Sequence, residues 1–173
     1  MSEIRTVTAT FITKPARRLI IRRGILSIDY FSYCEEIGCD IWAVLEKVPD
    51  RLDAVSFVVL PEFLVAPGTS KVGCAAEVPV DWRRPLPDGC DLIELAEHAM
   101  LWFQGAPYED ESWYGGAHAE MAAAVRGYRP ELYGYRFAYD SAPEFHYGAS
   151  PENGCRQLVP VAALNGRPPV RPV

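Results

Sequence analysis

The sequence has no long hydrophobic run, no signal peptide and no excess of positive charge. No apolar stretch approaches the 18 residues that a membrane-spanning helix needs, and the N-terminal MSEIRTVTAT does not resemble a secretory leader. Lys and Arg number 17 against 23 Asp and Glu, which gives a net charge of -6. Nucleic-acid-binding domains normally carry a basic face, so we expect neither direct nucleic-acid binding nor membrane association.

The five cysteines do not form a disulfide or metal-binding framework. Their number is odd, and no two are spaced as Cys-x-x-Cys. Cys34 and Cys39 lie five residues apart on one expected helix, which would point them to different faces. We therefore expect free thiols in a reducing, cytoplasmic compartment, and no metal site.

Standard catalytic motifs are also missing. The chain contains no Gly-x-Ser-x-Gly nucleophile motif and no Gly-rich phosphate loop ending in Gly-Lys-Ser. His118 and Glu120 match the His-x-Glu half of the zinc deaminase signature, but the Pro-Cys-x-x-Cys half is reduced to Pro151 and a lone Cys155. We expect no cofactor, and an enzymatic role becomes less favoured without being excluded.

What the sequence does contain is typical of one globular domain. It has 173 residues, of which 49% are hydrophobic, enough for a substantial core. Aromatic residues make up 12%. Such side chains line pockets as readily as they fill cores, so both interpretations stay open.

The segment Arg18 to Tyr33 is followed by a similar segment, Ala99 to Tyr114, at an offset of 81 residues. Gly24 corresponds to Gly105, Asp29 to Asp110 and Tyr33 to Tyr114. Each copy has the order apolar strand, glycine, acidic helix cap and aromatic first turn. We interpret the chain as two copies of one strand-helix-strand unit that enclose a cleft.

Residue periodicity gives the expected elements. Two helices are predicted, each preceded by an aspartate cap: Tyr30 to Val48, and about Glu111 to Gly127. Strands are predicted at residues 4–12, 16–23, 54–60, 71–78, 91–95, 97–104, 133–139, 144–147 and 155–161. We expect residues 1–161 to form a single domain and the Pro- and Arg-rich residues 162–173 to form a poorly ordered tail.

Aromatic and acidic side chains form the candidate site. Aromatic walls with a few polar groups describe a pocket for a flat, lipophilic ligand, and a buried carboxylate in it would favour a cation. The alternative is that the aromatic residues are core and the carboxylates are solvated. The expected ligand-binding residues are Tyr33, Trp42, Glu77, Trp102, Tyr108, Trp113 and Tyr135.

Several segments resemble the gyrase-inhibitor-like small-molecule-binding domain, the effector-binding domain of many AraC- and MerR-type regulators, which has a SOUL-like fold. They are PARRLIIRRG, DYFSYCEEIGCDIWAVL, LPEFLVAPGTSKVGCAAEVPVDW, PDGCDLIEL, LWFQGAPYEDE and ELYGYRFAYDSAPEF, and the resemblance covers roughly residues 4–161. The stretch Ala106-Pro107-Tyr108 resembles the Gly-Pro-Tyr turn of that family.

The resemblance implies an α+β fold of tandem βαββ repeats with pseudo-twofold symmetry. In it, two long helices flank a ligand groove over an antiparallel sheet. Family members bind lipophilic, often cationic, aromatic compounds, and many carry a pocket glutamate on the last strand. This chain has Gln157 there, so the resemblance adds Gln157 to the expected ligand-binding residues. The chain shows no helix-turn-helix segment, and its complete-looking N-terminus favours a stand-alone protein, monomeric or homodimeric.

Three functions remain in competition. The first is binding of a flat aromatic small molecule, neutral or cationic, for effector sensing or sequestration, including multidrug binding and transcription regulation. The second, also implied by the resemblance, is hydrolysis of a cyclopropane-bearing or similar electrophilic genotoxin. There Glu77 or Glu144 would position water and Tyr108 would donate a hydrogen bond. The third is an inhibitory protein-interaction module.

Overall fold

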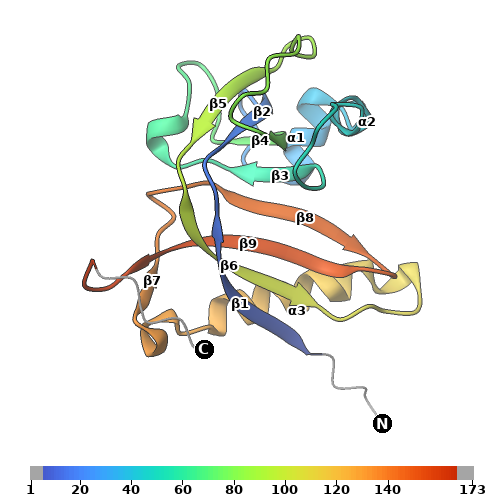
Figure 1. Ribbon diagram of the computed structural model, residues 1–173. Helices are drawn as coiled ribbons and strands as arrows, with labels where there is room; N and C mark the ends of the chain where they lie inside the picture. Colours follow the sequence, from blue (N-terminus) through green and yellow to red (C-terminus); the bar gives the residue numbers. More distant parts are fainter. Residues whose placement is uncertain (1–5, 167–173) are drawn as a thin grey trace.

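The computed structural model describes residues 6–166. Its regular elements follow in chain order (Figure 1): β1 (Val7–Lys14), β2 (Arg17–Arg23), α1 (Tyr30–Ile37), α2 (Asp40–Glu46), β3 (Ser56–Val59), η1 (Glu62–Leu64), β4 (Val72–Val78), β5 (Asp91–Leu95), β6 (His98–Gly105), η2 (Glu111–Trp113), α3 (Tyr114–Gly127), η3 (Pro130–Tyr133), β7 (Tyr135–Phe137), β8 (Glu144–Ser150) and β9 (Gly154–Ala163). The fold is α+β, as predicted.

The strand order shows the internal repeat directly. The antiparallel sheet runs β1-β6-β9-β8-β3-β4-β2-β5, with β7 paired to β9 off this path. One half is therefore β6-β9-β8 and the other is β2-β4-β3, and the two meet where β3 pairs with β8. Each half is completed by the strand that leads into the opposite half, since β1 pairs with β6 and β5 pairs with β2. The predicted two-copy architecture is confirmed.

The first helix differs from the prediction. One long helix was expected over Tyr30 to Val48, but α1 ends at Ile37 and α2 begins at Asp40. Gly38 has a φ of 92° and donates its backbone N–H to the Cys34 carbonyl, which closes α1. Glycine adopts such backbone angles at little cost, so it ends the helix even though the apolar spacing continues beyond it.

This break also corrects the expectation for Cys34 and Cys39. Cys39 stands at the N-terminus of α2 instead of continuing α1, and its thiol interacts with that of Cys34. The two side chains therefore lie near each other and not on different faces of one helix. All five cysteines are free.

The helix starts follow the predicted capping chemistry. The Asp29 side chain accepts a hydrogen bond from the Ser32 N–H, and the Ser32 hydroxyl oxygen accepts one from the Asp29 N–H, which forms a capping box. Asp110 accepts from the Ser112 N–H at the start of η2. The second predicted helix is confirmed as η2 followed by α3.

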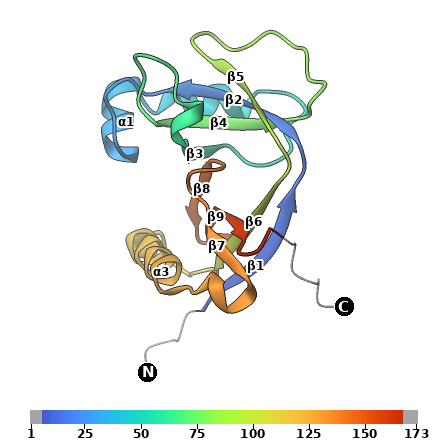
Figure 2. The same cartoon turned by 90° about the vertical axis from the view of Figure 1, so that its left-hand side faces the viewer.

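The core lies on both faces of the bent sheet. Figure 2 shows α1 and α3 on the same side of the sheet, with β1–β2 and β5–β6 running past each other on the opposite side. Ile20, Tyr33 and Phe57 belong to the cluster under α1 and α2, and Leu101 and Met121 belong to the cluster under α3. A third cluster covers the face away from the helices; its members include Leu19, Ile21, Val58, Met100, Phe145 and Leu158.

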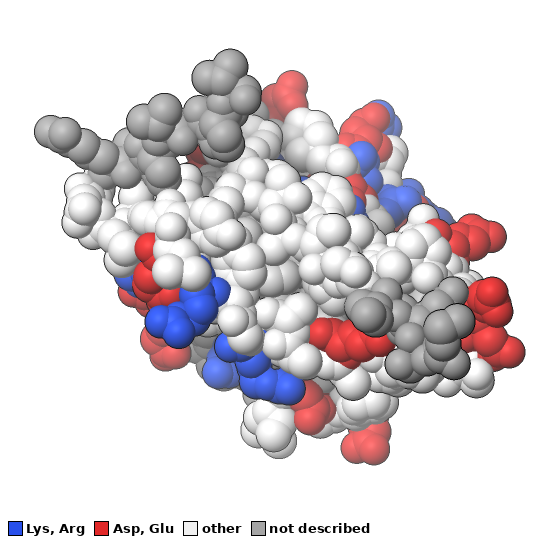
Figure 3. Space-filling model, turned by 90° about the horizontal axis from the view of Figure 1, so that it is seen from below, with Lys and Arg blue, Asp and Glu red and all other residues white. Residues whose placement is uncertain are grey.

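The surface and the chain end add two observations. Seen from below (Figure 3), Lys and Arg form small groups beside Asp and Glu, and much of the visible described surface is uncharged. β9 runs to Ala163, two residues into the expected tail, because Ala162 and Ala163 pair with β7. Residues 167–173 of that tail lie outside the described range. Within residues 6–166, no helix is long and apolar enough to cross a membrane.

Candidate functional site

The candidate site is a cleft between the two halves of the molecule, formed by two adjoining hollows of about 510 Å³ each. Asp53, Ala54 and Tyr147 line both hollows, so the two adjoin at these residues. The first half contributes α2 and the loop before β3, and the second half contributes β6, β8 and β9. The other lining residues are Trp42, Glu46, Arg51, Leu52, Val55, Trp102, Gln104, Gly148, Ala149, Ser150, Asn153, Gly154 and Arg156.

Two glycines shape the end of the β8–β9 hairpin that borders the cleft. Gly148 has a φ of 78° and lies in the irregularity between His146 and Ala149, where the register with β9 shifts. Gly154 has a φ of 66°, and a Cβ added there would lie 2.2 Å from the Gly105 carbonyl oxygen. Any larger residue would therefore push the hairpin away from β6.

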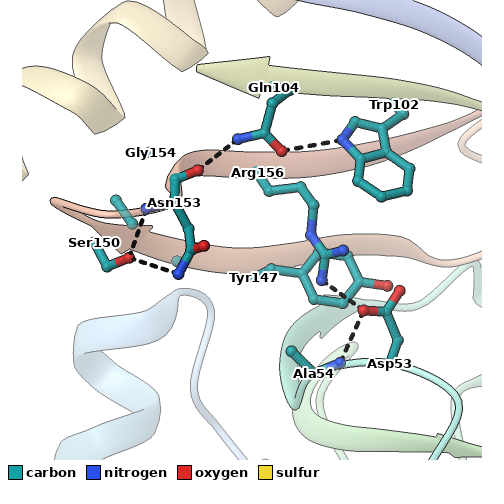
Figure 4. Close-up of a pocket in the computed structure, with 11 residues that line it drawn as sticks. Asp53, Ala54, Trp102, Gln104, Tyr147, Ser150, Asn153, Gly154 and Arg156 are labelled. Carbon is teal, nitrogen blue, oxygen red and sulfur yellow. Dashed lines mark hydrogen bonds and ion pairs between the residues drawn. The ribbon is translucent and has the colours of Figure 1, made fainter. Parts of the chain in front are cut away.

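Strand alternation places the aromatic walls. Trp102 and Tyr147 pack with the cluster on the sheet face away from the helices. The Trp102 indole N–H donates to the Gln104 side-chain oxygen at 3.2 Å, and the Gln104 amide donates to the Asn153 carbonyl at 2.7 Å (Figure 4). These bonds fix the orientation of the indole along one wall.

Arg156 lies between the two aromatic walls. Its guanidinium carbon is 3.6 Å from the Tyr147 ring centroid and 5.0 Å from that of Trp102. Its Nη2 donates to Asp53 at 2.7 Å (Figure 4). Burial raises the pKa of Asp53, but hydrogen bonds from Arg156 and from the Ala54 N–H outweigh it, so the net pKa of that carboxyl is lowered.

A buried network of charges lies beneath the cleft. Glu77 is fully buried and receives hydrogen bonds from Arg17 Nε, from Lys14 Nζ at 3.1 Å and from the Tyr147 hydroxyl at 2.9 Å. Lys14 also donates to Asp53 at 3.1 Å, which links the deep pair to the cleft wall. Burial, with the nearby Glu77 charge, raises the pKa of the Tyr147 hydroxyl, so Tyr147 stays a hydrogen-bond donor.

The structure brings together only some of the residues predicted to bind ligand. Trp42 and Trp102 line the cleft from opposite halves, and Glu77 lies below it. The other five expected residues do not line it. Tyr33, a residue of α1, is buried in the core, Tyr108 lies in the core against α3, and Tyr135 stacks on Phe11. The exposed Trp113 ring lies against Gly116.

Gln157 belongs to a separate polar group on the helix-facing side of the sheet. It donates to Glu144, whose carboxylate also lies 2.9 Å from His146 Nε2. Phe57 is paired in register with His146 and Gln157 pairs with it from the other side, so these three side chains share one face. Glu144 thus provides a carboxylate beside Gln157.

The three residues considered for hydrolysis are not assembled. Glu77 is bound by Arg17 and Lys14 on one face of the sheet, Glu144 lies on the other face, and Tyr108 is in the α3 core. Within the described residues, no group of three or more His, Cys, Asp or Glu side chains could hold a metal ion.

The sequence prediction missed Asp53, Tyr147 and Arg156. Arg156 alternates with Cys155 and Gln157 along its strand, which already places it on the opposite face. Its partners come from residues 53 and 147, and no local pattern indicates that pairing.

Comparison with known proteins supports the fold. No family model and no curated protein matches this chain. Among solved structures, it is similar to SAV2435 bound to tetraphenylphosphonium, with a TM-score of 0.56, 14% identity, and coverage of 91% of this chain and 96% of that chain. It is also similar to a candidate transcription regulation protein from Staphylococcus aureus, with a TM-score of 0.52, 15% identity, and coverage of 90% and 99%. These likenesses show a shared fold, and membership of the gyrase-inhibitor-like family stays a prediction.

Proposed function

We propose that this protein binds a lipophilic aromatic small molecule in the cleft between its two halves, as a sensor or as a sequestering protein. One observation carries the proposal: Trp42, Trp102 and Tyr147, drawn from both halves, line adjoining hollows of about 510 Å³. Small-molecule sites typically have volumes of roughly 300–1,000 Å³ and combine aromatic walls with a few polar groups.

The similar structure of SAV2435 supports this proposal, because that protein was solved with the aromatic compound tetraphenylphosphonium. The position of the cleft supports it as well. Ligand sites often form where two halves of a fold meet, and here each half supplies one tryptophan.

The test is binding of the neutral, flat probe 1-pyrenemethanol, measured by fluorescence titration and by thermal shift. At a probe concentration 100 times its Kd, the folded state gains about 2.7 kcal/mol, which is a shift of several degrees for a domain of this size. Trp102→Ala removes one aromatic wall and should weaken binding by about tenfold or more. Trp113→Ala is the matched control, since Trp113 does not line the cleft, and it should leave binding unchanged.

A second variant tests the same site in case Trp102→Ala does not fold. Ala54 is exposed and lines both hollows, so Ala54→Trp fills the cleft without removing a native contact of its side chain. Ala54→Trp should abolish binding of the probe, and its near-UV circular dichroism should show that the protein is still folded. Undiminished binding in both Trp102→Ala and Ala54→Trp would refute the cleft as the site.

A further inference from the structure

The charges beneath and around the cleft do not balance. The connected network contains three cations, Lys14, Arg17 and Arg156, and two carboxylates, Asp53 and Glu77. Its formal charge is therefore 3 − 2 = +1. All five side chains are largely removed from water, with exposed fractions between 0% and 17%. The two other charged residues that line the cleft, Glu46 and Arg51, cancel each other formally.

Of the three cations, Arg156 is the most exposed, at 17%. Arg17 is 3% exposed and its Nε is committed to Glu77, and Lys14 bridges both carboxylates. Arg156 instead lies in the wall of the cleft (Figure 4). A guanidinium has five N–H donors in a planar fork, and the ion pair with Asp53 uses Nη2. The donors on Nε and Nη1 are not used by Asp53 and can meet an anionic group.

Arg156 also takes the place that a cationic ligand would need. Cations bind over the faces of aromatic rings, and the guanidinium already lies over Tyr147 and beside Trp102. An aromatic cation would have to displace this side chain from both rings and from Asp53. An aromatic anion leaves all three contacts in place.

We propose that the cleft binds an aromatic anion, a flat ring system bearing a carboxylate or sulfonate, and that Arg156 receives its charge. This rests on the proposed function and names its ligand class. Unpaired buried charge is costly, so an incoming anion completes the pairing of the network. A hydrogen-bonded ion pair between guanidinium and the anion is stronger than a neutral hydrogen bond.

Three pyrene probes of similar shape test the proposal: pyrene-1-sulfonate, 1-pyrenemethanol and 1-pyrenemethylammonium. Fluorescence titration should show the sulfonate binding about tenfold or more tightly than the ammonium probe. Relative to its effect on the neutral probe, Arg156→Met should reduce affinity for the sulfonate by a similar factor and improve binding of the ammonium probe. Arg136→Met is the matched control, because Arg136 is half exposed on β7 and pairs with Asp140.

Asp53→Asn tests the preference for an anionic ligand while Arg156 itself is kept. It removes a negative charge from the cleft wall, so affinity for the sulfonate should rise. If Arg156→Met fails to fold by near-UV circular dichroism, this variant and Arg156→Lys keep the test decisive. Arg156→Lys retains the charge but not the planar fork, and its preference should be intermediate.

The outcomes separate the two proposals. If 1-pyrenemethanol binds but the sulfonate binds no better than the ammonium probe, the assignment of an anionic ligand is overturned and the small-molecule function stands. The same conclusion follows if the preference survives in Arg156→Met. If none of the three probes binds, the small-molecule function is overturned as well.

Discussion

Replacing Glu77 by Gln should destabilise the fold strongly. The carboxylate is fully buried and receives hydrogen bonds from Arg17, Lys14 and Tyr147. Glutamine preserves the volume but removes the charge. Lys14 keeps Asp53 as a partner, whereas Arg17, only 3% exposed, is left without a carboxylate. Removing one partner of a buried ion pair costs about 3–5 kcal/mol.

Urea unfolding followed by tryptophan fluorescence measures this cost, and calorimetry gives the matching fall in Tm. For a chain of this length, about 2–4 °C per kcal/mol predicts a drop of roughly 6–20 °C. Glu94→Gln is the matched control. Glu94 pairs with Arg18 at 2.8 Å but is 77% exposed, and exposed pairs contribute at most about 1 kcal/mol.

Replacing both members of the buried ion pair by apolar residues completes the test. In Arg17→Met/Glu77→Leu both charges are gone, and apolar replacements of buried pairs are often neutral or stabilising. This double variant should recover most of the stability that Glu77→Gln loses. The reasoning is refuted if Glu77→Gln behaves like Glu94→Gln, or if the double variant is as unstable as the single one.

Two further predictions concern α3 and the cleft wall. Gly115→Ala should stabilise the protein by roughly 0.5–1 kcal/mol in urea unfolding, because a Cβ there meets nothing within 4 Å. Gly116→Ala should lack this gain, since its Cβ would lie 2.5 Å from the Trp113 ring. The lowered pKa of Asp53 contributes stability that is present above the ordinary pKa of 3.8 and lost as the pH falls through the folded value. An acid titration of wild type and Asp53→Asn should therefore show a shallower acid limb in the variant.

Local chemistry accounts for the parts of the fold that the sequence predicted. The capping aspartates Asp29 and Asp110 act within three residues of themselves, and both helix starts were predicted correctly. The repeat was inferred from the matched order of strand, glycine, acidic cap and aromatic first turn, and Gly24 and Gly105 follow or end equivalent strands that each pair inside their own half.

The break at Gly38 could not be found from periodicity. Ile37, Ile41 and Leu45 all pack against the same core cluster, so the apolar stripe is continuous although the helix is not. Glycine inside a helix costs only about 1 kcal/mol, which leaves an intact and a broken helix close in energy. The apolar pattern alone therefore does not distinguish between them.

The sequence prediction of the candidate site rests on residue type, and it lacks the lining residues that depend on long-range pairing. Tryptophan is conspicuous in any sequence, and Trp42 and Trp102 were identified on that basis. Arg156 matters because Asp53, 103 residues away, holds it against Tyr147. That juxtaposition arises only when β8 pairs with β9 and the loop before β3 closes over them.

Different residues of the charge network should govern the stability of the fold and the preference for an anionic ligand. Arg17 and Glu77 are deep and cancel each other, so removing both as Arg17→Met/Glu77→Leu leaves Lys14, Asp53 and Arg156, whose formal charge is still 2 − 1 = +1. The preference for pyrene-1-sulfonate over its ammonium counterpart should therefore survive in the repacked variant. Arg156→Met should instead lose that preference with a smaller loss of stability than Glu77→Gln, because Asp53 retains Lys14 at 3.1 Å. If Arg17→Met/Glu77→Leu and Arg156→Met each lose both stability and the preference for the sulfonate probe, the network acts only in stabilising the fold.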